Sequence, residues 1–228
     1  AFFPQHRGLV IFSLYILGVV LGILSGLMFK KTMFTGQEAP FVIELPPYRM
    51  PSAKNVWTHV WERVSHFLEK AGTIIFAMSV LLWFLESFNF SFQMVENAGD
   101  SIIGRIGSLI APVFTPLGFG TWQAAVALLT GLVAKEMVVS SLSMFYGFPI
   151  TAGGPEVAAA MTGFTPLSAF SMLVFILLYV PCVAAVSTLF KEMNSPKWAW
   201  FSIGWQLGCA YLMSMLVYQL GGLLLGII

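Results

Sequence analysis

Two charged side chains, Lys135 and Glu136, lie side by side in the apolar stretch LLTGLVAKEMVVSSLSMF, residues 128–145. No other charged residue occurs between Arg105 and Glu156. An ionisable side chain at membrane depth costs at least about 2.5–3.5 kcal/mol on insertion scales, and it usually faces a cavity or a partner. We therefore interpret Glu136 as a ligand or gate on a cation path. The alternative is a structural ion pair with groups on other helices.

If this stretch is a continuous helix, Ser140 and Ser143 share the face of Glu136, because residues at i+4 and i+7 recur on one side. One carboxylate and two hydroxyls would then line the path as oxygen ligands. Lys135 points about 100° away, and adjacent residues on a helix do not face each other. Lys135 is therefore predicted to be a gating residue, which holds the path closed or balances Glu136 when no metal is present.

The second candidate is LLYVPCVAAVS, residues 177–187. Pro181 lacks an N–H and disrupts the hydrogen bond to the carbonyl of Leu177. The freed Leu177 carbonyl and the Cys182 thiol would offer a metal ion an oxygen and a sulfur, with Pro181 as a hinge for gating. The alternative is that Cys182 is a small buried apolar residue. Cys209 lacks such surroundings and is interpreted as a packing residue.

The types of ligand in these two stretches indicate which cations could follow the path. Thiolates suit soft or borderline metals, and carboxylates suit harder ones. A path with both Cys182 and Glu136 therefore fits Fe(II), Mn(II) or Zn(II) better than Na⁺ or K⁺. The three histidines are too few for a His-rich metal site.

Composition places these residues in a membrane protein. The 228 residues are 58% hydrophobic and only 9% charged, whereas a soluble domain carries about 25% charged residues. Uncharged runs exceed the about 20 residues that a spanning helix needs. The predicted spans are residues 8–28, 71–85, 165–190 and 198–221. In the first span, Gly18, Gly22 and Gly26 share one face and predict close helix packing.

Residues 29–52 form a polar connection with four prolines, which exclude a continuous helix. Ser52 is predicted to cap the helix that follows. Its sequence, residues 52–72, is amphipathic, with Trp57 and Trp61 on the apolar face. We expect this helix to lie in the membrane interface before the chain enters the bilayer.

The positions of Lys and Arg predict the orientation. Six of them lie between the first two spans, at positions 30, 31, 49, 54, 63 and 70, and Lys191 and Lys197 precede the last span. Both regions are therefore expected on the cytoplasmic side, and residues 86–105 outside.

Residues 106–120 contain Pro112, Pro116 and several glycines, which suit a broken helix. A broken hairpin of 106–120 with 121–145 then places Lys135 and Glu136 in a re-entrant structure.

Three stretches together resemble the bacterial ferrous iron transport protein B family. FVIELPPYRMPSAKNVWTHVWERVSHFLEKAGTIIF (residues 41–76) resembles its cytoplasmic linker and helix. GTWQAAVALLTGLVAKEMVVSSLSMFYG (residues 120–147) resembles its second Gate motif. LLYVPCVAAVSTLFKEM (residues 177–193) resembles its late Pro-Cys span. Lys135 and Glu136 match the Ala-Lys-Glu segment of the family, which often has Gly in place of Ser140.

The resemblance implies Fe(II) transport into the cytoplasm, with Cys182 matching the later of the cysteines proposed to line the path. It also implies an N-terminal GTP-binding domain and a first Gate motif elsewhere in the same protein. GTP would act only through that domain. Expected partners are the lipid bilayer, small cytoplasmic accessory proteins and further copies of the protein, and no nucleic acid. The expected location is the bacterial cytoplasmic (inner) membrane, with several spans.

The predicted fold is an all-α polytopic membrane protein with an interfacial amphipathic helix and a broken or re-entrant helical hairpin. We predict three parts: a transmembrane helix (1–28), a cytoplasmic linker with the amphipathic helix (29–70), and a transmembrane core with the second Gate motif (71–228). No P-loop or nucleophile–base pair is recognisable, so we do not expect an enzyme. Two alternatives stay open: a Gate-type transporter of a nucleoside-like solute, and a membrane assembly subunit of a GTPase system.

Overall fold

The computed structural model of the chain describes residues 2–3, 5–33, 50, 52–95, 97–149, 151, 154–193 and 195–226. Most of the predicted proline-rich connection lies outside this part. The described residues form helices α1 (Arg7–Thr32), α2 (Ala53–Ser87), α3 (Ile102–Phe114), α4 (Trp122–Gly131), α5 (Met137–Tyr146), α6 (Gly154–Ala160), α7 (Pro166–Leu178), α8 (Val183–Glu192) and α9 (Pro196–Leu225), with 3-10 turns η1 (Ala98–Asp100) and η2 (Thr115–Leu117). The short α6 lies in the connection between α5 and α7.

Three helical segments in the described part are long and apolar enough to cross a membrane: Arg7–Thr32, Pro166–Glu192 and Pro196–Leu224. The bent pair Ile102–Leu117 and Trp122–Gly131 makes a fourth if it crosses as one span. No residue of α1 is buried, so its apolar surface is available to lipid. The first span and the last two are therefore confirmed, and the chain is a polytopic helical membrane protein.

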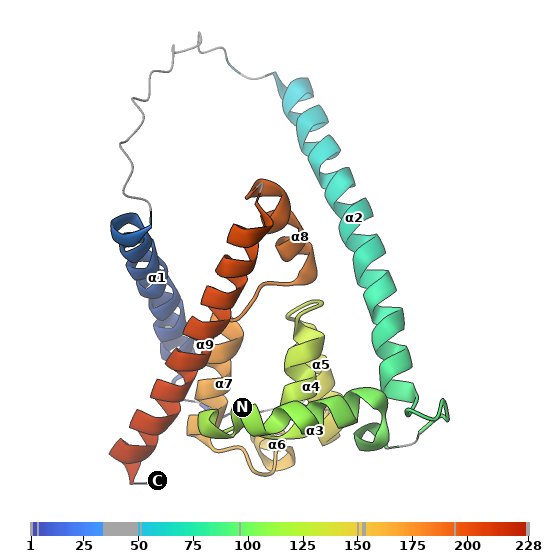
Figure 1. The fold of residues 1–228 in the computed structure, drawn as a ribbon, viewed down its shortest axis with the longest axis vertical. Coiled ribbons are helices and arrows are strands. Elements are labelled where there is room, and N and C mark those ends of the chain that lie inside the picture. The colour runs from blue at the N-terminus through green and yellow to red at the C-terminus, as the bar shows by residue number, and fades with distance from the viewer. Residues whose placement is uncertain are drawn as a thin grey trace.

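Helix α2 contains both the predicted amphipathic helix and the predicted second span. The Ser52 side chain caps it as expected, by accepting a hydrogen bond from the Asn55 N–H (3.3 Å). The helix then runs without a break for 35 residues, or about 52 Å at 1.5 Å per residue. No proline interrupts it, and a single glycine such as Gly72 is tolerated in a helix. In Figure 1, α2 is one long helix along one side of the molecule.

The chain turns sharply between α3 and α4, whose axes differ by 99°. Gly118, which follows η2, has a φ of 86° in the left-handed region, which glycine adopts without strain. Thr121 then caps α4 by accepting a hydrogen bond from the Ala124 N–H (3.3 Å). In Figure 1, α3 lies across the lower end of the molecule, and α4 and α5 rise from that end.

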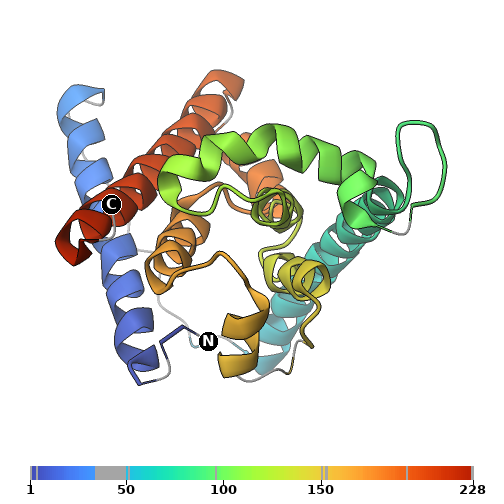
Figure 2. The same ribbon diagram turned by 90° about the horizontal axis from the view of Figure 1, so that it is seen from below.

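The bend between α3 and α4 lies at the break that the sequence predicts between residues 106–120 and 121–145, and it confirms that break. A further reversal, which the sequence does not predict, follows at residues 132–136, between α4 and α5. These two helices pack side by side. Figure 2 looks along this hairpin, with α2 on one side and α1, α7 and α9 on the other.

Helices α7 and α9 pack against each other through a buried pair of serines. The hydroxyls of Ser171 and Ser214 lie 2.8 Å apart, and Ser171 is also within hydrogen-bond distance of the Leu117 carbonyl (2.8 Å). In Figure 1 the end of α1, the start of α2 and the α8–α9 connection all lie at the upper end. The elements that carry the predicted cytoplasmic charges thus gather at one end of the molecule.

Candidate functional site

The turn between α4 and α5 contains both charged residues of the re-entrant hairpin. Helix α4 ends at Gly131, and the N–H of Met137, the first residue of α5, donates to the Ala134 carbonyl (2.9 Å). Below the turn, the hydroxyls of Thr130 and Ser141 are buried and lie 2.9 Å apart, which holds the two helices together. Lys135 and Glu136 are therefore in a turn at the tip of a hairpin, and not in the middle of a helix.

A second interruption separates α7 from α8. Helix α7 ends at Leu178, and Tyr179 is extended, with φ −68° and ψ 172°. Helix α8 begins at Val183, so Cys182 occupies its N-cap position. Pro181 lies in the non-helical segment, as expected from its missing N–H. This interruption confirms that the span predicted for residues 165–190 is broken around Pro181.

The two interruptions are joined by two hydrogen bonds. The N–H of Val183, at the start of α8, donates to the carbonyl of Leu132 in the α4–α5 turn (2.8 Å). The Lys135 ammonium donates to the carbonyl of Ile176 in the last turn of α7 (2.9 Å). A cation in that position satisfies a carbonyl without a helical partner and interacts favourably with the negative end of the helix dipole.

Tyr179 completes this junction. The Lys135 nitrogen lies 4.8 Å from the centroid of the Tyr179 ring, within the range of a cation–π contact. Tyr179 is 4% exposed, and its hydroxyl has no hydrogen-bond partner in the described part of the chain. Gly131 lies so close to this hydroxyl that a Cβ there would overlap it.

Sequence reasoning missed Tyr179, Gly131 and the Ile176 carbonyl. A tyrosine two residues before Pro181 and a glycine four residues before Lys135 are the available signals, and neither is specific. For the carbonyl, the sequence predicts Leu177, four residues before Pro181. In the structure α7 ends before the proline, and Lys135 binds the carbonyl of Ile176. The Leu177 side chain is directed to α1, with Cδ2 3.7 Å from the Cβ position at Gly18.

Glu136 directly precedes α5, which contains both Ser140 and Ser143, but the three side chains differ in their surroundings. Glu136 is exposed at the start of α5. Ser143 is buried, and its hydroxyl donates to the Phe148 carbonyl. Ser140 is partly buried. No group of three or more His, Cys, Asp or Glu residues in the described part could hold a metal ion. The metal roles of Glu136, Ser140, Leu177 and Cys182 stay predictions.

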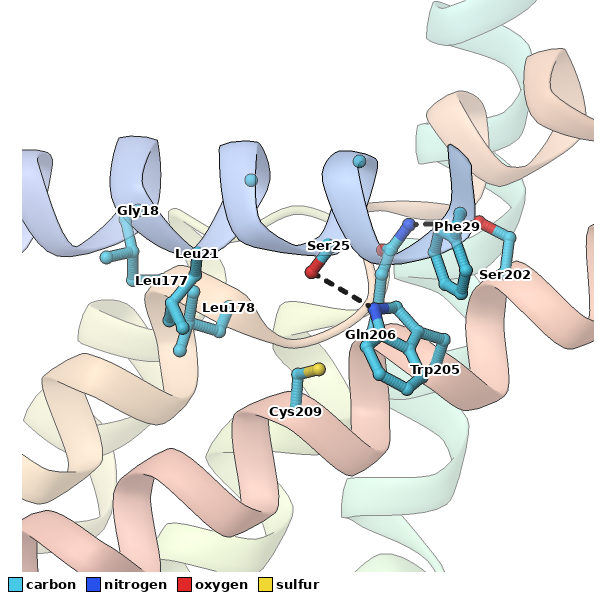
Figure 3. Close-up of a pocket in the computed structure, with 12 residues that line it drawn as sticks. Gly18, Leu21, Ser25, Phe29, Leu177, Leu178, Ser202, Trp205, Gln206 and Cys209 are labelled. Atoms are coloured by element: carbon cyan, nitrogen blue, oxygen red, sulfur yellow. Dashed lines mark hydrogen bonds between the residues drawn. The ribbon is translucent and has the colours of Figure 1, made fainter. Parts of the chain in front are cut away.

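A separate groove of about 480 Å³ lies between α1, α7 and α9 (Figure 3). Gly22 and Gly26 line it and would meet nothing within 4 Å if they carried a Cβ. The predicted close packing of this glycine face is therefore wrong for the described residues. Trp205 donates to the Ser25 hydroxyl across the groove (3.3 Å), and the Cys209 thiol points into it. Among the described residues, no Lys, Arg, Asp, Glu or His lines the groove.

Two family models match the chain. The Gate model, described as nucleoside recognition, matches residues 68–196, more than half of the chain. The model for the C terminus of ferrous iron transport protein B matches residues 11–63. The chain belongs to the ferrous iron transport protein B family. The Gate match contains both interruptions, from α4–α5 to α7–α8.

Relatives in this family align over nearly all of the chain. The Fe(2+) transporter FeoB of Staphylococcus aureus (strain COL) is 39% identical over 222 residues, which are 97% of this chain and 33% of the relative. That of Methanocaldococcus jannaschii is 36% identical, covering 98% of this chain and 34% of the relative. The chain thus spans about a third of the length of these curated relatives. No solved structure matches the chain.

Proposed function

We propose that the chain is the C-terminal membrane part of a transporter that carries Fe(II) into the cytoplasm. The observation that carries the proposal is the junction of two interrupted helices, α4–α5 and α7–α8. Interrupted helices expose backbone carbonyls and helix ends, and in many transporters they form the ion site near the bilayer midplane. Irregular backbone is tolerated at that depth only where it is buried in protein or lines a cavity.

The residues at this junction have distinct proposed roles. Cys182 supplies a sulfur ligand, which suits a borderline metal such as Fe(II). Glu136 is exposed at the hairpin tip and attracts cations. Lys135 holds the path closed, because its hydrogen bond to Ile176 joins the hairpin tip to α7. Pro181 permits the bend between α7 and α8 through which the two parts can separate.

The complete protein is proposed to include further parts. The curated relatives are about three times as long as this chain. We propose that a GTP-binding domain and a first Gate motif of the same protein regulate transport. The relative from Porphyromonas gingivalis is a fusion of Fe(2+) transport protein A with Fe(2+) transporter FeoB, which favours a small accessory protein as a partner. The proposed location is the bacterial cytoplasmic membrane.

Uptake into proteoliposomes tests this function. The full-length protein is reconstituted, Fe(II) uptake is measured under anaerobic conditions with and without GTP, and Mn(II) and Zn(II) are tested as competitors. We expect Cys182→Ser and Glu136→Gln to reduce uptake about 10–100-fold, as for changes at other metal sites. Cys209→Ser is the matched control, because Cys209 lies in the separate groove. Unchanged uptake in both site variants at normal expression would refute the site assignment.

A nucleoside-like solute is the second candidate substrate. The Gate family description, nucleoside recognition, favours it, and the groove of about 480 Å³ offers space for an organic molecule. The same proteoliposomes are tested with a labelled nucleoside. Nucleoside uptake without Fe(II) uptake would support this alternative. Normal uptake in all site variants, with loss of complex formation, would instead support an assembly subunit.

A further inference from the structure

The Lys135 ammonium contacts two groups that favour positive charge. It donates to the Ile176 carbonyl at 2.9 Å, at the C-terminal end of α7. It lies 4.8 Å from the centroid of the Tyr179 ring, whose face attracts cations. Cys182, at the N-terminus of α8, directly precedes Val183, whose N–H donates to the Leu132 carbonyl of the same turn (2.8 Å). A carbonyl and an aromatic face therefore contact one cation, close to the segment that carries the Cys182 thiol.

This cation is held by a flexible side chain that comes from another part of the fold. Lys135 belongs to the α4–α5 turn, and Ile176 is 41 residues further along the chain. The turn itself is fixed to α8 by the hydrogen bond from Val183 to Leu132 (2.8 Å). The four-carbon stem of a lysine can change rotamer while its backbone stays in place. The ammonium can therefore leave while the helices stay joined.

The Tyr179 hydroxyl is a second, independent indication of a ligand at this junction. The side chain is 4% exposed, and the described part of the chain gives its hydroxyl no hydrogen-bond partner. Buried hydroxyls in proteins are nearly always paired. A hydrated metal ion at Cys182 would bring water molecules that can pair with this hydroxyl.

We propose that the Lys135 ammonium is a built-in competitor of the transported cation, and that it occupies the site formed by the Ile176 carbonyl, Tyr179 and Cys182 until a divalent metal ion displaces it. The inference rests on the function proposed above and adds a mechanism for ion entry. The metal ion binds the Cys182 sulfur, whose proton passes to solvent, and the ammonium withdraws. The site then keeps the same net charge, because a divalent ion and a thiolate replace an ammonium and a thiol.

The first test measures metal binding to the purified full-length protein. Co(II) serves as the probe, because its thiolate-to-metal charge-transfer absorption reports sulfur ligation. We expect Lys135→Met to bind Co(II) about tenfold more tightly, since a charge-assisted hydrogen bond no longer competes. Lys135→Arg keeps the competing charge and is expected to stay within about threefold of wild type. Lys191→Met, on the exposed end of α8, is the matched control and should bind like wild type.

The second test needs no variant at Lys135. An amine-reactive reagent modifies the wild-type protein with and without Co(II), and mass spectrometry measures modification of Lys135. We expect Co(II) to increase modification several-fold, and Cys182→Ser to abolish the increase. Equal modification at saturating, sulfur-bound Co(II) would overturn the inference, as would a folded Lys135→Met protein with wild-type affinity. If Cys182→Ser binds Co(II) normally and transports iron normally, the proposed path itself is wrong.

Discussion

Gly131→Ala tests whether the junction is packed as the structure describes. A Cβ at residue 131 would overlap the Tyr179 hydroxyl and a methyl group of Val138. These side chains are only 4% and 2% exposed, so neither can move into solvent. Overpacking of this kind costs about 1–3 kcal/mol. The gain from Ala over Gly near a helix end offsets less than about 1 kcal/mol. We therefore expect a net loss of about 1–2 kcal/mol.

Thermal unfolding of the full-length protein in detergent measures this loss. Gly22→Ala is the matched control, because a Cβ there meets nothing within 4 Å, and it should not lower the Tm. Tyr179→Phe removes the oxygen that the new Cβ meets, and this oxygen has no hydrogen bond to lose. Part of the Gly131→Ala loss should therefore disappear in the Tyr179→Phe background. Equal Tm values for Gly131→Ala and Gly22→Ala, or additive effects with Tyr179→Phe, would refute the described packing.

Three further predictions concern the elements that support the junction. Thr130→Val leaves the buried Ser141 hydroxyl without its 2.9 Å partner and should lower stability by about 1–3 kcal/mol; an unchanged Tm would contradict the contact. Ser214→Ala removes a hydroxyl that lies 2.8 Å from that of Ser171. We expect a similar loss of stability, measured as a lower Tm. An unchanged Tm would mean that this contact between α7 and α9 is weak. Pro181→Ala restores an N–H and favours a continuous helix through the break; Fe(II) uptake should fall while expression stays normal, and normal uptake would exclude the bend from the mechanism.

Much of the fold was predictable because its signals are local. The long apolar runs predict the first span and the last two, since burial of backbone polar groups in lipid requires helices. The Ser52 cap depends on a residue only three positions away, Asn55. The breaks near Pro116 and Pro181 follow from the missing proline N–H. In each case the physical cause lies within a few residues of its effect.

The α4–α5 turn could not be predicted in this way. No proline interrupts residues 128–145, so a continuous helix through Lys135 and Glu136 was the reasonable expectation. The turn is instead joined to a distant segment, since the Leu132 carbonyl accepts from Val183 and the Lys135 ammonium donates to Ile176. Contacts between segments so far apart in the chain leave no periodic pattern in the sequence.

The sequence by itself determined that this is a helical membrane protein, that its helices break near two proline positions, and that Lys135, Glu136 and Cys182 are unusual for their depth. Only the tertiary structure decided which groups meet. It brought the Lys135 ammonium to the Ile176 carbonyl and the Tyr179 ring, and it placed the Tyr179 hydroxyl against a glycine, Gly131. Where a helix forms in the membrane depends on the residues of that segment and on the lipid around them. Which groups meet at a junction depends on how separate helices pack, which is a property of the whole fold.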